Sequence, residues 1–449
     1  MKLPAAFLCL LPSAVFACAL PPSVILTLPT GYFILGAALT VAMTALVMIN
    51  TRWLPRMAVR QVYRGTARFP FMATSYLSFV ILCALILLGL YGPTDPMHNL
   101  LTLIFWTGIW IALPLAIMVF GNLWVGTNPW IAPVRLTRVL LGRTTGIGLS
   151  AFGTWPAVLG FAGFAWFQIV SIAPDDPQRL AQLAVIYWLI IFAAAVIEGE
   201  DWLEQGEFLT VFFRMISRIA PFWRTRQGHQ VTGSVGWPGA QIVHMPPLDR
   251  SQMAFVTICL AALTFDGLSE TFFWLGLIGQ NPLEFGGRSA VVWVNTVGLL
   301  GTWALTITAI WAALKLGEMI SGATLQAGPS MLSFLAIAAG YHAAHYFVTL
   351  LTAGQFTLGA LNDPLSRGDD LLGLPTVYVS FGFLTQPNTM QIIYGVQFLA
   401  ILFAHLLAVA LSLRSAKKNV GPNAHLPMTL LMVGYTVLGL WLLSTARGA

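Results

Sequence analysis

The stretch MATSYLSFVILCALILLGLY, residues 72–91, has no charged residue in its whole length. A helix of about 20 residues rises about 30 Å, which is the thickness of the hydrocarbon core of a membrane. In hydrocarbon a segment has to satisfy its own backbone hydrogen bonds, and a helix does so. The stretch therefore predicts a transmembrane helix.

The rest of the chain repeats this pattern. Of its 449 residues, 57% are hydrophobic and 8% are charged, whereas soluble proteins spend about a quarter of their residues on charge. Further apolar windows of sufficient length lie near 30–49, 100–121, 152–173, 180–197, 253–278, 290–313, 331–353, 390–413 and 427–445. We predict an all-α polytopic membrane protein with about ten transmembrane helices, whose main partner is the lipid bilayer. Nothing in the +6 net charge points to nucleic acid.

The N-terminus, MKLPAAFLCLLPSAVFACA, combines one lysine, a short apolar run and a small-residue ending. This is typical of a cleavable secretory signal, so we predict a signal peptide over 1–19 and a single transmembrane domain over 20–449. A short uncleaved first helix is the alternative. The four cysteines of the chain show no disulfide or zinc spacing.

The basic residues indicate the orientation. Cytoplasmic loops of membrane proteins carry an excess of Lys and Arg. With the arginine-rich loop around 52–68 placed inside, seventeen basic residues fall inside and four outside, leaving out Lys2. The split predicts that both ends of the mature chain lie outside.

Two connections between the predicted helices are long. Residues 198–252 fall inside, and the segment 206–223 has aromatic and aliphatic residues at near-helical spacing, which favours a helix on the membrane surface. We interpret the acids of this connection as a solvated face rather than as metal ligands. Residues 354–389 form an outer loop that could cover a site from the periplasmic side.

Polar residues also occur inside the predicted spans. Counting at 1.5 Å per residue, Asp266 and His345 each lie roughly 20 Å above the cytoplasmic ends of their helices. Glu270 is one turn further along than Asp266, and His342 is an i, i+3 neighbour of His345. At a similar depth on the descending helix are Tyr394 and Gln397, with His405 about 10 Å deeper.

Charges in hydrocarbon are costly, so such residues tend to face one another or a hydrated cavity. Imidazole nitrogens and carboxylate oxygens together suit zinc, iron or manganese. The sequence therefore predicts a site with Asp266, Glu270 and His345 as catalytic residues and a divalent metal ion held by Asp266, Glu270, His342, His345 and His405. A structural pairing of acid and histidine is the alternative that spacing alone leaves open.

Several blocks of the sequence resemble a known family. These are GNLWVGTNPW (121–130), the segment 206–223, AFVTICLAALTFDGLSETFFW (254–274), AAHYFVTLLTAGQ with NDPLSRGDDLLG (343–373), and VQFLAILFAHLLAVAL (396–411). In this order they are similar to the bacterial integral-membrane family known as fenitrothion hydrolases. The resemblance covers most of the chain after the signal and is most specific in the FDGxSE, AHYF and DPLxRGxDL blocks.

The resemblance implies a function and a location. It implies hydrolysis of organophosphorus triesters, such as aryl dialkyl phosphorothioates, in the bacterial inner membrane by an enzyme of two different membrane subunits, so that a second membrane subunit is expected as the partner of this chain. It adds Gln355, Asp363 and Asp369 to the candidates, which with Tyr394 and Gln397 we assign to the substrate and the covering loop. A histidine that the family carries ahead of its first helix has no counterpart in LPPSVILTLPTGY.

Two other classes of function fit the same residues. A non-catalytic scaffold or maturation subunit of a metal-dependent complex would agree with the absent histidine. A proton- or ion-coupled transporter would use buried acids for coupling, and broken helices are typical of such proteins.

Overall fold

The computed structural model describes residues 30–51, 56–66, 71–227, 230–373, 378–415 and 422–445. The predicted signal peptide, 1–19, lies outside these residues. The long helices are α1 (Thr30–Thr51), α2 (Phe71–Tyr91), α7 (Trp155–Ile169), α8 (Pro177–Glu198), α11 (Arg250–Ser269), α13 (Val292–Ser321), α15 (Phe334–His345), α16 (Phe347–Asn362), α17 (Pro387–Ser415) and α18 (Leu426–Ser444). Another is composite, with α3 (Leu100–Leu103) running through a π-helix (Ile104–Ala112) into α4 (Leu113–Phe120). The short elements are α5 (Trp124–Thr127), α6 (Ile131–Leu140), α9 (Leu203–Gly206), α10 (Phe208–Ile216), α12 (Phe272–Leu277), α14 (Ala327–Met331), β1 (Val59–Thr66), β2 (Phe222–Gln227) and β3 (Gln230–Gly236).

The helices agree with a polytopic membrane protein. Among the described residues, eight are long and apolar enough to cross a membrane, and nine are if the pair bent by 53° between His345 and Phe347 counts as one span. All ten predicted windows contain a helix, but α7 has only 15 residues. The α-helical membrane architecture is thus confirmed. Of the ten predicted transmembrane windows, eight or nine hold a helix that is long enough to cross a membrane.

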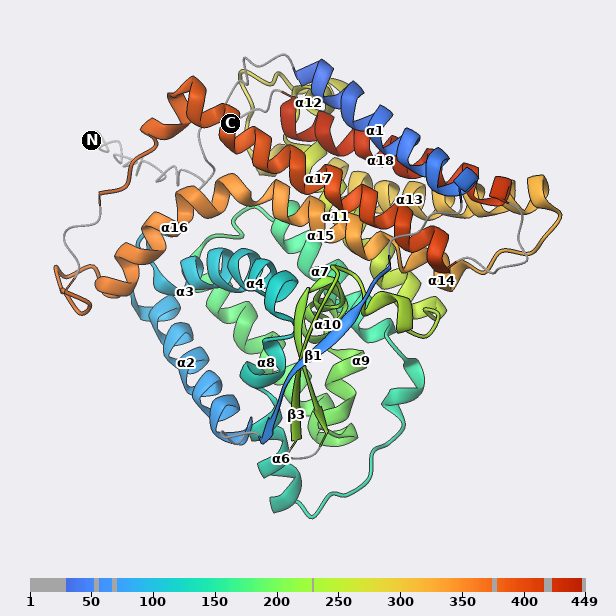
Figure 1. Ribbon diagram of the computed structural model, residues 1–449. Helices are drawn as coiled ribbons and strands as arrows, with labels where there is room; N and C mark the ends of the chain where they lie inside the picture. Colours follow the sequence, from blue (N-terminus) through green and yellow to red (C-terminus); the bar gives the residue numbers. More distant parts are fainter. Residues whose placement is uncertain are drawn as a thin grey trace, which may run out of the picture.

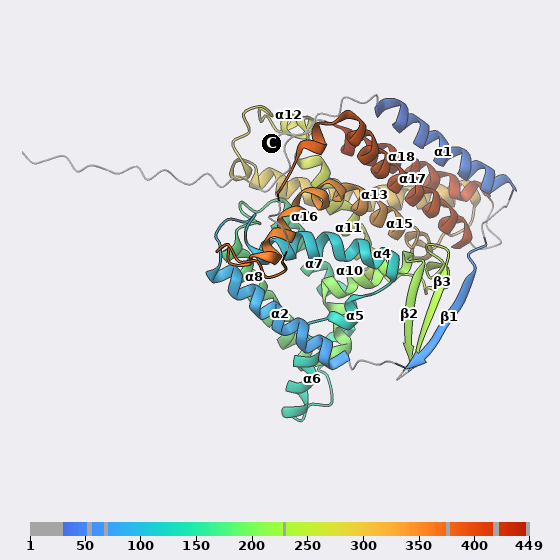
Figure 2. The same cartoon turned by 60° about the vertical axis from the view of Figure 1, so that its left-hand side comes forward.

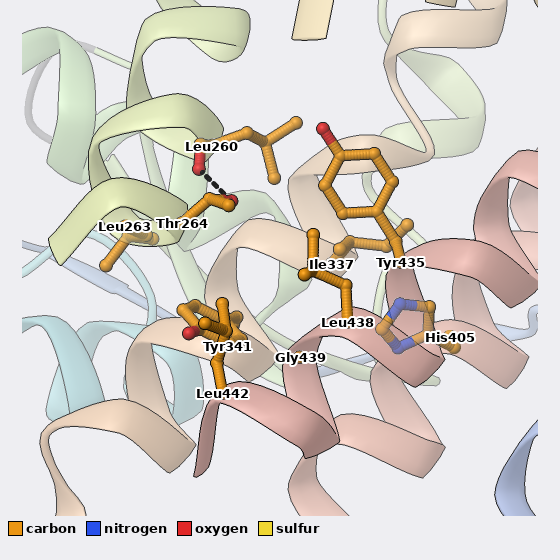
Figure 3. Close-up of a pocket in the computed structure, with 10 residues that line it drawn as sticks. All are labelled: Leu260, Leu263, Thr264, Ile337, Tyr341, His405, Tyr435, Leu438, Gly439 and Leu442. Atoms are coloured by element: carbon orange, nitrogen blue, oxygen red, sulfur yellow. Dashed lines mark hydrogen bonds between the residues drawn. The ribbon is translucent and has the colours of Figure 1, made fainter. Parts of the chain in front are cut away.

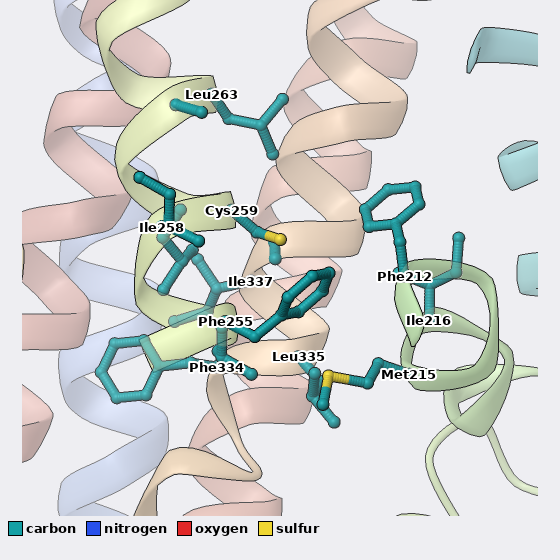
Figure 4. Close-up of a cluster of buried hydrophobic side chains, with 14 of the residues drawn as sticks. Phe212, Met215, Ile216, Phe255, Ile258, Cys259, Leu263, Phe334, Leu335 and Ile337 are labelled. Carbon is teal, nitrogen blue, oxygen red and sulfur yellow. The ribbon is translucent and has the colours of Figure 1, made fainter. Parts of the chain in front are cut away.

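The helices form two groups that meet in the middle of the molecule (Figure 1). One group holds α1, α13, α17 and α18, and the other holds α2, α3, α4 and α8 (Figures 1 and 2). Between them lie α7, α10, α11 and α15, where phenylalanines and aliphatic side chains of α10, α11 and α15 interdigitate (Figure 4). The central position of α11 and α15 places their polar residues inside the protein rather than against lipid.

A three-stranded antiparallel sheet with the order β1-β3-β2 joins two distant loops. Strand β1 belongs to the arginine-rich loop, and β2 and β3 belong to the 198–252 connection; Arg64 is paired with Thr232 and Arg224 with Gly233. Because paired strands cannot lie on opposite sides of a bilayer, both loops are on one side of the membrane. The charge pattern places them on the same side too.

The segment 206–223 is not a helix on the membrane surface, so that prediction is wrong. Within it, α10 has every residue except Arg214 buried. Its N-terminal amides can be buried because Glu207 accepts hydrogen bonds from the backbone N–H groups of Leu209 and Thr210 and from the hydroxyls of Thr210 and Tyr187. A fully satisfied carboxylate at its start lets an apolar helix enter the core.

Two other acids of the 198–252 connection, Glu198 and Glu200, bind neighbouring segments. Glu198 accepts hydrogen bonds from four consecutive backbone N–H groups, those of residues 147–150, and from the Ser150 hydroxyl. Glu200 forms an ion pair of 2.6 Å with Arg135. Glu198 and Glu200 are thus partly exposed acids with structural partners, whereas Glu207 is fully buried, so the prediction of a solvated acidic face is wrong for Glu207.

The outer loop is shorter than predicted. Helix α16 continues to Asn362 and α17 begins at Pro387, so the first residues of the 354–389 segment are helical. The predicted apolar window, 331–353, ends before α16 does, because the last turns of the helix carry polar residues such as Gln355.

Candidate functional site

Asp266 and His345 are in direct contact in the centre of the protein. Nε2 of His345 lies 3.0 Å from Oδ2 of Asp266, and the side chains are only 7% and 15% exposed, respectively. A carboxylate oxygen accepts hydrogen bonds, so Nε2 carries the proton and donates it. Asp266 thereby fixes both the tautomer and the orientation of the imidazole.

The same carboxylate oxygen is held by two further donors. The hydroxyl of Tyr346 donates to Oδ2 of Asp266 at 2.7 Å, and Nε2 of Gln168 donates to the Tyr346 hydroxyl at 2.6 Å and to Oδ2 at 3.3 Å. Three donors on one oxygen compensate the desolvation of a buried carboxylate. The result is a polar network contributed by α7, α11 and the junction of α15 with α16.

A glycine permits the close approach of α11 and α15. A Cβ atom on Gly267 would lie 2.6 Å from the hydroxyl oxygen of Tyr341. The ring of Tyr341 in turn stacks on that of His345, with centroids 5.7 Å apart and an angle of 22° between the planes. The glycine beside Asp266 therefore sets the position of the histidine that Asp266 binds.

The second nitrogen of His345 is not bound by the described residues. Nδ1 is buried and has no hydrogen-bond partner in the described part of the chain. With the proton on Nε2, this nitrogen carries a lone pair and is a base. The pair has the arrangement in which a carboxylate orients an imidazole for general-base catalysis.

A cation lies at the C-terminal end of α7, next to the network. Nη1 of Arg288 donates to the carbonyl oxygens of Gln168 at 2.7 Å and of Ser171 at 3.3 Å. Its charge also acts on Asp266 and Asp175. Burial raises the pKa of Asp175, and the charge of Arg288 opposes that rise. Arg288 therefore anchors the C-terminal end of α7, whose Gln168 binds Asp266.

Sequence reasoning missed Gln168, Tyr346 and Arg288. Gln168 was detectable, because it is a polar residue in the apolar helix WPAVLGFAGFAWFQI and the rule that singled out Asp266 applies to it. Tyr346 directly follows His345 in the AHYF block. Arg288 gave no signal, since a basic residue in a loop is common.

His342 has a different partner from His345. Its Nε2 donates to the carbonyl oxygen of Trp110 at 3.0 Å. Trp110 belongs to the π-helix, Ile104–Ala112. His342 thus binds a backbone carbonyl of this π-helix and is not joined to Asp266 by a hydrogen bond.

The remaining predicted metal ligands are not assembled around Asp266. Glu270 is the C-cap residue of α11, and Nδ1 of His405 donates to the carbonyl oxygen of Ile401 at 2.8 Å on its own helix. No group of three or more His, Cys, Asp or Glu side chains that could hold a metal ion occurs in the described ranges. Asp266 and His345 also use Oδ2 and Nε2 on each other. The described donors are not grouped as metal ligands, and the divalent metal ion stays a prediction.

The residues assigned to the substrate and the covering loop lie in two places. Gln355 binds both the backbone N–H and the carbonyl oxygen of Ser380 and thereby ties the loop to α16. Asp363 accepts hydrogen bonds from the N–H groups of Arg367 and Gly368 and closes a turn, while Asp369 is exposed. A role for them as a lid is untested.

On α17, Gln397 and Tyr394 are buried. Nε2 of Gln397 donates to the carbonyl oxygen of Ala344 at 2.8 Å, one residue before His345. Tyr394 packs its ring against Phe33 of α1, with centroids 5.7 Å apart. Gln397 therefore supports the backbone of the site, whereas Tyr394 belongs to the contact between α1 and α17.

Comparison of the chain with protein-family models, with curated proteins and with solved structures finds no match. The resemblance to the fenitrothion hydrolases accordingly stays a prediction from the motifs, and the geometry of Asp266 and His345 carries the argument on function.

Proposed function

We propose that the chain is a membrane-embedded hydrolase in which His345, oriented by Asp266, activates a water molecule. The hydrogen bonds of the His345 imidazole carry this proposal. An imidazole donates one N–H to a buried carboxylate at 3.0 Å while its other nitrogen is left without a partner. The motif resemblance supplies the substrate class, an organophosphorus triester with an aryloxide leaving group.

The chemistry follows from the two nitrogens of His345. Nδ1 removes a proton from water as the water oxygen forms a bond to phosphorus and the bond from phosphorus to the aryl oxygen breaks. Asp266 stabilises the imidazolium that forms, and Tyr346 and Gln168 keep the carboxylate in place. A general base of this kind contributes about 10²- to 10⁴-fold in rate. A nitrophenolate is a good leaving group and leaves without a protein acid.

The substrate class suits the position of the pair. Aryl dialkyl phosphorothioates partition into lipid, and Asp266 and His345 lie on helices that are long enough or apolar enough to be within the membrane. A site at that depth can receive such a molecule from the bilayer.

One observation favours a second function, proton-coupled transport. The helix that carries His345 is broken by 53° directly after it, at Tyr346, which is itself bound to Asp266. Helices interrupted at a buried polar site are typical of secondary transporters. In that case the Asp266–His345 pair would take up and release a proton during a conformational change.

The test uses the purified full chain, alone and in membranes with any natural partner subunit. Release of nitrophenolate from an aryl dialkyl phosphorothioate is followed by absorbance for the wild type, for His345→Gln and for a control, His98→Gln, whose histidine is exposed. Hydrolysis by the wild type and the control, with at least a 100-fold loss in His345→Gln, supports the proposal. Proton uptake by proteoliposomes without hydrolysis would favour the transporter.

A further inference from the structure

Two consecutive residues, His345 and Tyr346, bind the same oxygen atom. Nε2 of His345 lies 3.0 Å and the hydroxyl of Tyr346 lies 2.7 Å from Oδ2 of Asp266. In an α-helix of 3.6 residues per turn, consecutive side chains point about 100° apart. Their convergence on one atom therefore depends on the shape of the backbone where the two residues meet.

The backbone leaves the helix at Tyr346. This residue has φ of −91° and ψ of 4°, whereas α-helical residues have about −63° and −42°. The helical segments on its two sides, which end at His345 and begin at Phe347, are bent by 53°. A break can free backbone carbonyl groups of the preceding turn, and neighbouring helices satisfy such groups in membrane proteins. A donor from another helix therefore stabilises the break if it binds in the turn before Tyr346.

Gln397 of α17 is such a donor. Its Nε2 donates to the carbonyl oxygen of Ala344 at 2.8 Å, and the residue is only 8% exposed. In an unbroken α-helix this carbonyl would accept from the backbone N–H of Val348, four positions later. The side chain of Gln397 thus binds the last carbonyl group before His345, next to the break at Tyr346.

The packing of α15 on α17 holds the amide of Gln397 in place. A Cβ atom on Gly340, one turn before the bonded carbonyl, would collide with that of Ala404 on α17. Further from the break, Ile337 and Tyr341 of α15 and His405 of α17 line one small pocket (Figure 3). The two helices are therefore in close contact next to the hydrogen bond, so α17 is a fixed support for the break.

We propose that Gln397 is a positioning residue of the Asp266–His345 site. By binding the carbonyl oxygen of Ala344 it holds the break between α15 and α16, and the break directs His345 and Tyr346 to one oxygen of Asp266. The effect of Gln397 on a reaction rate rests on the proposed hydrolase function. Its effect on the hydrogen bond between His345 and Asp266 does not, so the two proposals can be tested separately.

The test observes the Nε2–H group of His345 by NMR in the full chain, labelled with ¹⁵N-histidine and reconstituted in lipid nanodiscs. Its signal is assigned by its loss in His345→Gln. The proton of an imidazole N–H bonded to a carboxylate resonates downfield of one bonded to a neutral acceptor. Gln397→Met keeps an unbranched side chain of similar length but removes the donor, and we expect it to move this proton upfield. An unchanged signal in Gln397→Met would overturn the proposal.

The matched control is Gln241→Met. Nε2 of Gln241 also donates to backbone carbonyl oxygens, those of Ser217 and Ala220, but in the 198–252 connection. We expect no shift of the His345 signal in this control, and a shift equal to that of Gln397→Met would contradict the positioning role.

A second variant, Gln397→Asn, decides the matter if Gln397→Met does not fold. Its amide is one methylene shorter and falls short of the Ala344 carbonyl, so an upfield shift supports the proposal and an unchanged signal contradicts it. For hydrolysis of an aryl dialkyl phosphorothioate we expect kcat of Gln397→Met to fall by up to about 100-fold, because a small misplacement of a catalytic group has effects of this size, with KM little changed. Absence of hydrolysis in the wild type would count against the proposed function, and the signal of His345 would still decide on Gln397.

Discussion

Gly267→Ala tests how α11 and α15 bring Asp266 to His345. The added Cβ would lie 2.6 Å from the Tyr341 hydroxyl oxygen, at least 0.8 Å closer than ordinary contact, which begins at 3.4 Å. Tyr341 is buried and stacked on His345, so its displacement also moves the imidazole. Overpacking of this kind costs about 1–3 kcal/mol.

The control is Gly163→Ala in the middle of α7, where a Cβ would meet nothing within 4 Å. Replacing a glycine in a helix by alanine stabilises by about 0.5–1 kcal/mol. That gain is common to both variants, so the difference between them is the overpacking itself. We expect Gly267→Ala to be less stable than Gly163→Ala by about 1–3 kcal/mol.

Thermal unfolding provides the assay. Cys259 is buried and becomes reactive to a thiol-directed fluorophore when the protein unfolds. A background with Cys9, Cys18 and Cys83 replaced by alanine leaves it as the single thiol of the chain. A difference of 1 kcal/mol shifts Tm by about 2–4 °C in domains of 150–250 residues, and by less in larger ones, so we expect a gap of a few degrees. Equal Tm values for the two glycine variants would refute the close approach of Gly267 to Tyr341.

Two further predictions concern groups outside the site. Glu207→Gln replaces a carboxylate that accepts four hydrogen bonds by an amide with only one acceptor oxygen. Thermal unfolding should therefore show a loss of stability of about 1–3 kcal/mol. The control Glu200→Gln breaks a half-exposed ion pair and should cost about 0–1 kcal/mol, so similar losses in the two variants would contradict the capping role of Glu207. The backbone N–H of Arg367, helped by that of Gly368, lowers the pKa of Asp363 below its ordinary value of 3.8. The ionised Asp363 carboxylate therefore stabilises the turn above pH 3.8, and this stabilisation is lost as the pH falls below that value. Hydrogen exchange at the amides of Arg367 and Gly368, corrected for intrinsic rates, should accelerate at low pH in the wild type. In Asp363→Asn this pH dependence should disappear.

The sequence was informative where simple physical constraints apply. Apolar windows located the long helices because hydrocarbon thickness limits their length. The contact between Asp266 and His345 was foreseeable from the rise per residue together with the cost of an isolated charge in lipid. Both arguments need only distances along a helix.

What remained hidden depends on contacts between distant segments. The segment with α10 looked amphipathic, and its burial follows from the carboxylate of Glu207, whose donors include Tyr187 on another helix. His342 looked like a ligand because nothing in the sequence pairs it with the carbonyl of Trp110. Helical spacing gives the face and depth of a side chain but not the partner across the interface.

The central claim, that the Asp266–His345 pair activates water, is tested most directly by Asp266→Asn. The amide keeps the shape of the side chain but removes the charge that orients and stabilises the imidazole. In membranes that contain any natural partner subunit, we expect a folded, normally inserted protein whose rate of nitrophenolate release is lower by about 10²- to 10⁴-fold. A rate near that of the wild type would contradict the account and leave FDGLSE as a structural polar network.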